Sequence, residues 1–239
     1  GDYVVTEGVD TRNITVASAD GWSVPVRVYR RSGSGQDLPM LVYYHGGGFF
    51  GGGVDIVEQM CKVLVSQLDC VVLNVDYRLC PEAHYPQPLD DCWAATRWAF
   101  EHAAELGAAK KPLAVSGDSA GGNLALVLTM LLRDAGRLLP RRLVLMSPWT
   151  DMTASGKSYR ERRDADPMIT MNYIQAVRAA YAPGRELSSP MLSPLFGDFD
   201  RFPPVLIQVG TNEILMSDSV RLRDRLVQAG IPCRLEVWP

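Results

Sequence analysis

The sequence predicts an α/β fold, with a mostly parallel sheet and helices on both of its faces. Short apolar runs rich in β-branched residues alternate with longer amphipathic stretches along most of the chain. Most of the short runs are apolar throughout, as expected for strands that are covered on both faces. The chain has 239 residues, of which 47% are hydrophobic and 21% charged, so it can bury a large core without disulfide or zinc support.

The predicted elements begin with a hairpin and continue as alternating strands and helices. Asp20-Gly21 separates two β-branched runs, 14–17 and 24–29, as a hairpin turn does. The strands that follow are predicted at residues 40–44, 71–75, 113–115, 143–146, 205–209 and 234–237. The helices between them are predicted at residues 56–68, 89–106, 120–135 and 218–229.

Residues 150–199 interrupt this alternation. They hold a charged run, a short helical pattern near residues 170–181 and several prolines. Open α/β sheets bind ligands at the carboxyl ends of their strands. We therefore expect this excursion between two strands to form a lid over that end of the sheet.

Charge and cysteine content exclude several classes of protein. The net charge of −3 gives no field that would attract nucleic acid or an anionic membrane, and no apolar run is long enough to span a bilayer. The five cysteines are odd in number and lack CxxC spacing, which predicts free thiols in a reducing, cytoplasmic compartment. No metal-binding motif is present, and neither a metal nor another cofactor is expected.

Ser119 is the predicted nucleophile. It is the central residue of Gly117-Asp118-Ser119-Ala120-Gly121, a G-x-S-x-G motif between a predicted strand and a predicted helix. Small neighbours permit the strained strand-to-helix turn that makes a serine hydroxyl project from the sheet. The alternative is a glycine-rich helix start with a solvated serine. The agreement of motif, strand and helix favours the nucleophile.

The glycine-rich loop His45–Phe49 is the second catalytic candidate. Glycines allow backbone N–H groups to turn toward a bound oxyanion, because no side chain blocks the approach. We predict that the donors are the N–H groups of Gly47, Gly48 and Ala120. His45 is then a structural histidine that holds the loop.

The same glycines admit a second interpretation. Gly46, Gly48 and Gly51 match the dinucleotide-binding fingerprint, and Asp76 closes the next strand at a suitable distance. The glycines continue through Gly53, however, so the helix starts late, and this interpretation leaves the serine motif unexplained. A nicotinamide-dependent oxidoreductase is therefore the weaker alternative.

Four segments occur together in an order typical of one family. They are His45–Phe49, Asp76–Glu82, Gly117–Gly122 and Asp166–Met168. Together they resemble the hormone-sensitive-lipase-like (bacterial family IV) carboxylesterases of the α/β-hydrolase superfamily, over roughly Val24 to Pro239. The resemblance implies one catalytic domain over residues 1–239, with an eight-stranded sheet and a partial cap at about 150–199. It also implies hydrolysis of short-chain acyl esters without a cofactor.

The family order of serine, acid and histidine places the acid after the strand predicted at 205–209. Glu213 lies where many relatives carry aspartate, and Asp218 is the rival, although in relatives that later position is usually structural. We favour Glu213. The alternative is that neither is catalytic and both are ordinary loop carboxylates at a helix start.

The histidine that the family requires is harder to place. The three histidines, His45, His84 and His102, all precede the acid. The resemblance places the catalytic histidine just past Pro239 and N-terminal cap helices ahead of Gly1. We expect both segments to lie outside this chain.

The resemblance also suggests the substrate-binding residues and partners. Phe49, Phe50, Asp118 and Met168 are expected at the pocket for a small acyl ester. The last strand, at the edge of the sheet, is a candidate homodimer interface. An alternative from another class is a non-catalytic ligand-binding protein similar to plant gibberellin receptors, which resemble this family but have lost the histidine.

Overall fold

One mixed sheet of eight strands forms the centre of the computed structural model, which describes residue 4 and residues 7–239 without the side chains of residues 110–113. The strands are β1 (Val9–Ala17), β2 (Ser23–Arg31), β3 (Leu38–Tyr44), β4 (Val71–Val75), β5 (Ala108–Asp118), β6 (Arg142–Met146), β7 (Val205–Gly210) and β8 (Cys233–Trp238). Their order across the sheet is β1-β2-β4-β3-β5-β6-β7-β8. The pairs β1–β2 and β2–β4 are antiparallel and the other five neighbouring pairs are parallel, so the predicted fold class is confirmed.

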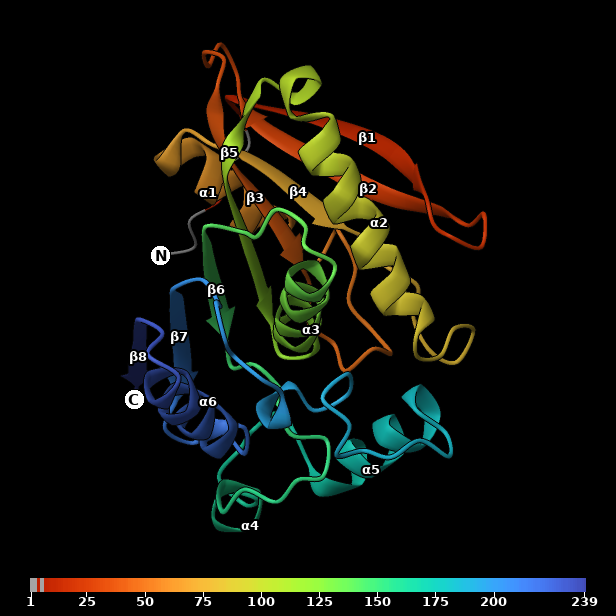
Figure 1. Cartoon of the computed structure of the whole chain (residues 1–239), viewed down its shortest axis with the longest axis vertical. Coiled ribbons are helices and arrows are strands. Elements are labelled where there is room, and N and C mark those ends of the chain that lie inside the picture. The colour runs from red at the N-terminus through yellow and green to blue at the C-terminus, as the bar shows by residue number, and fades with distance from the viewer. Residues whose placement is uncertain (1–3, 5–6) are drawn as a thin grey trace.

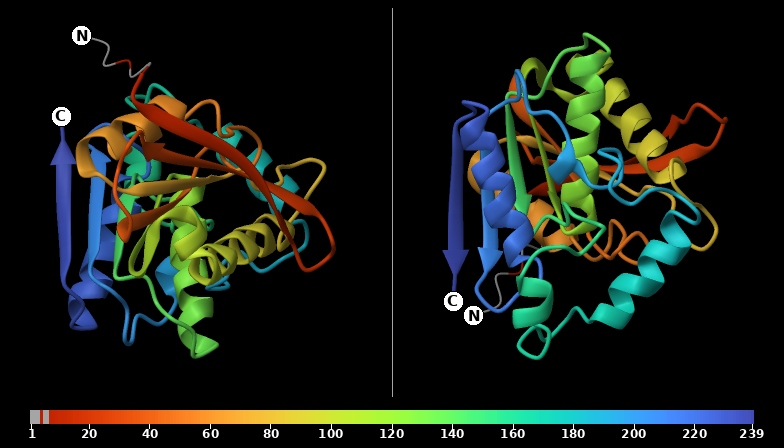
Figure 2. Two further views of the ribbon diagram at one scale, coloured as in Figure 1. Left: turned by 90° about the horizontal axis from the view of Figure 1, so that it is seen from above. Right: turned by 60° about the horizontal axis from the view of Figure 1, so that its bottom comes forward.

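Helices cover both faces of this sheet. They are α1 (Glu58–Leu68), α2 (Gln87–Glu101), α3 (Ala120–Asp134), α4 (Ser158–Glu161), α5 (Met171–Tyr181) and α6 (Met216–Gln228). Seen from above in Figure 2, α1 lies on one face and α2, α3 and α6 lie on the other. The valine-rich β4 is buried at all five positions because it is covered from both sides.

Several predicted elements differ in extent from the structure. The run predicted at 14–17 is only the end of the nine-residue β1. The strand predicted at 113–115 is much longer, since β5 hydrogen-bonds to β3 on one side and to β6 on the other. The helix predicted at 89–106 divides into α2 and a 3₁₀ turn over Ala103–Leu106, which closes at Gly107 with a φ of 70°. A left-handed φ of this kind is the usual end of a helix.

The excursion between β6 and β7 lies beyond the carboxyl ends of the strands, as predicted (Figure 1). It carries α4 and α5. The face of α5 that holds Ile174, Val177 and Tyr181 is fully buried against the domain. The excursion is therefore a cap whose apolar side chains pack into the core of the domain.

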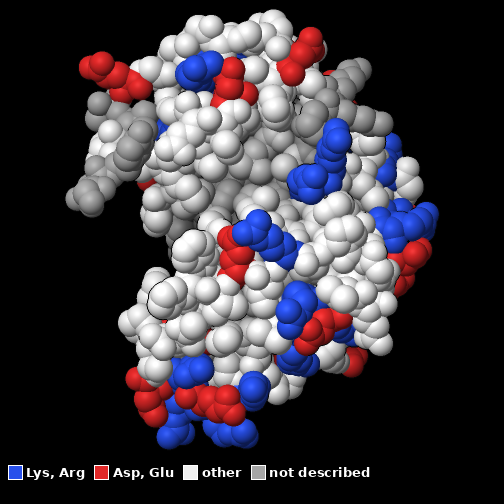
Figure 3. All heavy atoms as spheres, turned by 90° about the vertical axis from the view of Figure 1, so that its left-hand side faces the viewer, with Lys and Arg blue, Asp and Glu red and all other residues white. Residues whose placement is uncertain are grey.

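Helix length, surface charge and cysteine state bear on the classes of protein that the sequence excludes. Within residues 4 and 7–239, no helix has the length and apolar character needed to cross a membrane. On the face shown in Figure 3, the described acidic and basic side chains are interspersed, which leaves that face without a field of one sign. The five cysteines are free thiols, as predicted.

Candidate active site

Ser119 lies at a sharp turn between β5 and α3. Its backbone has a φ of 50° and a ψ of −115°, a left-handed conformation that costs energy for a residue with a side chain. The turn is held by two backbone hydrogen bonds: Ser119 N–H donates to Met146 O (2.9 Å), and Trp149 N–H donates to Ser119 O (3.0 Å). The strained elbow expected from the motif is thus present.

The glycine loop follows the end of β3 and faces this elbow. Gly47 and Gly48 have φ values of 117° and 61°, which favour glycine. In the described part of the chain, the N–H groups of Gly47 and Gly48 meet no protein acceptor. They are free to bind an oxyanion. Because α1 begins only at Glu58, these glycines do not open a helix as the dinucleotide fingerprint requires.

Asp118 connects the elbow to the loop. Its Oδ1 accepts hydrogen bonds from Tyr43 Oη (2.5 Å) and from the N–H of Gly46 (2.8 Å). A Cβ atom on Gly46 would overlap the other carboxylate oxygen. Asp118 lines the pocket as predicted, but this carboxylate braces the glycine loop.

A cavity of about 330 Å³ brings most of the predicted site residues together. Of the predicted residues, it is lined by Gly47, Gly48, Asp118, Ser119, Met168 and Glu213. Five further residues line the cavity. Ile169 and Tyr173 belong to the excursion around Met168–Tyr181 that the family resemblance places at the pocket, whereas Met146, Ser147 and Leu215 were not expected from the sequence. Most of them come from the cap or directly follow a strand of the parallel sheet. Segments of this kind lie at the carboxyl end of the sheet, where open α/β sheets bind ligands, and this position could have indicated them.

Two predicted pocket residues lie elsewhere. The ring of Phe49 is fully buried and stacks on Tyr181, with centroids 3.7 Å apart and planes within 3°. Phe50 is 38% exposed and does not line the cavity. The expectation that both phenylalanines line the pocket is corrected, because the loop turns Phe49 into the core. Ala120 is buried as the first residue of α3.

The two candidate acids have different surroundings. Glu213 lines the cavity, and its Oε1 accepts a hydrogen bond from the N–H of Gly210 (2.7 Å). Asp218 is fully buried outside the cavity, and its Oδ2 accepts from the N–H groups of Thr150 (2.8 Å) and Asp151 (2.9 Å). Burial, reinforced by the charge of Asp151, raises the pKa of Asp218 to about 7. The geometry therefore favours Glu213 as the acid at the pocket.

None of the three histidines lines the cavity. The His45 ring stacks on Tyr77, its Nδ1–H donates to Gly46 O (2.8 Å), and burial lowers its pKa. The other two rings lie on the protein surface or along α2: His84 Nδ1 bonds to Ala180 O, and His102 stacks on Trp98. The end of β8 does reach the acid loop, since Thr211 N–H donates to Trp238 O (2.8 Å).

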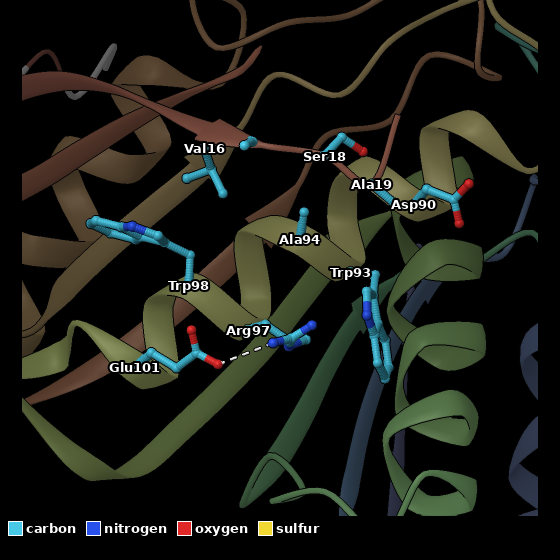
Figure 4. Close-up of a pocket in the computed structure, with 10 residues that line it drawn as sticks. Val16, Ser18, Ala19, Asp90, Trp93, Ala94, Arg97, Trp98 and Glu101 are labelled. Carbon is cyan, nitrogen blue, oxygen red and sulfur yellow. Dashed lines mark hydrogen bonds and ion pairs between the residues drawn. The ribbon is translucent and has the colours of Figure 1, made fainter. Parts of the chain in front are cut away.

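Another groove, of about 310 Å³, lies between the end of β1 and the outer surface of α2 (Figure 4). Trp93 and Trp98 flank it, and the ion pair between Arg97 and Glu101 lies at its rim. It holds none of the predicted catalytic residues. Among the described residues, no cluster of three or more potential metal ligands is found. The cavity at Ser119 is therefore the candidate active site.

Sequence comparison shows the family to which the chain belongs. Residues 41–239 match a family described as having the alpha/beta hydrolase fold. The carboxylesterase NlhH of Mycobacterium tuberculosis is 38% identical over 221 residues, which cover 90% of this chain and 69% of that protein. An esterase of Acinetobacter venetianus is 34% identical over 200 residues, which cover 83% of this chain and 65% of that protein.

Solved structures give the same result. An esterase of the bacterial hormone-sensitive lipase family matches with a TM-score of 0.88 and 34% identity, over 98% of this chain and 75% of that one. A hyperthermophilic esterase from Pyrobaculum calidifontis matches with a TM-score of 0.91 and 31% identity, over 96% of this chain and 75% of that one. The chain belongs to the hormone-sensitive-lipase-like family of α/β-hydrolase carboxylesterases.

Proposed function

We propose that this protein hydrolyses short-chain acyl esters through an acyl-enzyme intermediate on Ser119. The observation that carries the proposal is the shared cavity. It joins a serine in a strained elbow, the free N–H groups of Gly47 and Gly48, and the carboxylate of Glu213. A nucleophile, oxyanion donors and an orienting acid are three of the four parts that serine acyl transfer needs, and a general base is the fourth.

In the proposed first step, Ser119 Oγ attacks the carbonyl carbon of the ester. The carbonyl oxygen becomes an oxyanion and accepts hydrogen bonds from the N–H groups of Gly47, Gly48 and Ala120. Removing one such donor typically costs ~3 kcal/mol of transition-state stabilisation. The C–O bond then breaks, the alcohol leaves with the serine proton, and water hydrolyses the acyl-enzyme in a second step.

The serine proton passes through a general base. We propose a histidine that follows β8, with Glu213 holding its imidazole in the productive orientation. The support is positional. The last residues of β8 hydrogen-bond to Thr211, two residues before Glu213, so the chain leaves the sheet beside the acid.

The cavity also supports a short acyl group. Its volume of about 330 Å³ lies at the low end for small-molecule pockets. Apolar side chains of Met146, Met168, Ile169 and Leu215 supply much of its lining. These surroundings suit a small aliphatic acyl chain.

A second candidate function is ligand binding without catalysis. One observation favours it: no histidine of this chain lines the cavity. A fluorophosphonate probe separates the two functions. An activated Ser119 reacts with it rapidly, and a serine without a base reacts slowly or not at all.

The direct test is Ser119→Ala. We expect hydrolysis of p-nitrophenyl butyrate to fall by at least ~10³-fold and fluorophosphonate labelling to disappear, because the nucleophile is lost. The matched control is Ser66→Ala on α1, where the hydroxyl bonds only to the carbonyl of Lys62. Near-full activity of Ser119→Ala would reject the mechanism.

A further inference from the structure

The cap helix α5 contacts the glycine loop at two points. Near its end, Tyr181 stacks on Phe49 of the loop. Near its start, Tyr173 Oη donates a hydrogen bond to the carbonyl oxygen of Gly47 (3.1 Å). Val177 lies midway between them and is fully buried. The spacing of four residues puts all three side chains on one face of the helix, which therefore rests along the loop.

The phenol of Tyr173 fits closely over Gly48. A Cβ atom at Gly48 would overlap the phenol oxygen and would lie 2.9 and 3.1 Å from two ring carbons. The φ of 61° at Gly48 independently favours glycine. Helix and loop are thus in direct contact at the residue that carries an oxyanion donor.

One peptide unit links this contact to the chemistry. The carbonyl of Gly47 and the N–H of Gly48 belong to the same peptide group, so the orientation of one fixes that of the other. The carbonyl accepts hydrogen bonds from Tyr173 Oη and from the N–H groups of Phe50 (3.1 Å) and Gly51 (3.0 Å). Donors at the carbonyl polarise the peptide and make its N–H a stronger donor.

We propose that Tyr173 is a positioning residue for the oxyanion hole, through which the cap helix holds the N–H of Gly48 toward the reacting oxygen. The inference rests on the proposed esterase function and deepens it, because the cap then contributes to transition-state stabilisation as well as covering the pocket. Burial raises the pKa of Tyr173 above its usual value of 10. The hydroxyl therefore stays protonated, and able to donate, throughout the neutral range.

The variant Tyr173→Phe tests this with the ring retained and the donor removed. We expect kcat for p-nitrophenyl butyrate to fall roughly three- to tenfold, with KM changed less than about twofold, since the lost hydrogen bond acts on the transition state. The control is Tyr85→Phe. Tyr85 packs edge-on against Tyr181 of the same helix, and its hydroxyl has no hydrogen-bond partner among the described residues. A role confined to anchoring the cap or shaping the pocket would instead change KM and leave kcat unaltered, which would overturn the inference.

A second readout does not depend on turnover. In protein labelled with ¹⁵N-glycine, loss of the hydrogen bond to the Gly47 carbonyl should shift the amide resonance of Gly48. Tyr85→Phe should leave that resonance in place. A Gly48 resonance that is the same in Tyr173→Phe and in the unaltered protein would overturn the proposal, whatever the kinetics.

Fluorophosphonate labelling separates failure of this inference from failure of the esterase function. Ser119 Oγ bonds to phosphorus, its proton passes to the general base, fluoride leaves, and the phosphoryl oxygen occupies the oxyanion site. Labelling of the unaltered protein, with slower labelling of Tyr173→Phe, supports both proposals. Equal rates for the two overturn the role of Tyr173 and leave the esterase function standing. No labelling and no hydrolysis by the unaltered protein would overturn both.

Discussion

Gly121 shows how close backbone packing places the nucleophile. A Cβ atom at this residue would overlap the carbonyl oxygen of Tyr44, at the end of β3. The first turn of α3 can therefore touch β3 only without a side chain here, and this contact sets Ser119 against the glycine loop. We expect Gly121→Ala to lower the free energy of unfolding by about 1–3 kcal/mol, measured by urea denaturation. Gly35→Ala is the control, because nothing lies within 4 Å of its Cβ position. Equal stability of the two variants would contradict this account.

The residues that could be predicted are those whose local sequence carries the constraint. Ser119, Gly47 and Gly48 lie in motifs because the elbow and the loop admit few other residue types. Tyr173 has no such pattern, since a single tyrosine on a helix can point anywhere until the packing of the helix is known. Phe49 was misplaced for the same reason, because its stacking partner Tyr181 lies in the cap, far along the sequence.

At the scale of elements, one carboxylate ties the cap to the acid loop. Asp166 Oδ1 accepts hydrogen bonds from the N–H groups of Met168 (2.8 Å) and Ile169 (2.9 Å), which line the pocket. Its Oδ2 accepts from the N–H of Ile214 (2.8 Å), the residue after Glu213. The Asp166 side chain thus fixes the position of the cap segment at Met168 relative to the loop that carries Glu213.

We expect Asp166→Ala to lower kcat/KM for p-nitrophenyl butyrate roughly tenfold, because three backbone donors lose a charged acceptor and the Glu213 loop loosens. Steady-state kinetics measure this. The neighbouring Asp164→Ala should be without effect, since Asp164 is exposed and pairs only with Arg163. If the two variants have the same activity, Asp166 does not position the acid loop.

The elements themselves were predicted better than their limits. Apolar periodicity identified the central strands, and the limits of β4 match residue for residue. The strand predicted at 113–115 was too short because two lysines at 110 and 111 interrupt the apolar run. Pairing with β3 and β6 nevertheless extends β5 to Ala108–Asp118. Pairing between strands satisfies the backbone N–H and C=O groups even where the local residues have a low β-propensity. The sequence of one strand alone therefore does not reveal how far it is paired.

At the scale of the whole molecule, a buried carboxylate joins the cap to the sheet domain. Asp218, in the first turn of α6, accepts hydrogen bonds from the backbone of Thr150 and Asp151, where the cap begins, and from Tyr159 Oη (3.1 Å). Its Oδ1 has no partner among the described residues. Burial is the main reason that its pKa is raised to about 7.

This raised pKa makes the stability of the molecule depend on pH. The reference pKa is 3.8, so the folded state binds an extra proton between about pH 4 and pH 7. The contribution of Asp218 to the free energy of unfolding is fully present below pH 4 and is lost as the pH rises through 7. Asp218→Asn cannot ionise. We compare the free energies of unfolding of the unaltered protein and of this variant by urea denaturation at each pH. The unaltered protein should lose roughly 1–3 kcal/mol of stability relative to the variant between pH 5 and pH 8. The same difference for the exposed Asp224→Asn should stay constant, and a constant difference for Asp218→Asn would show that Asp218 does not titrate in this range.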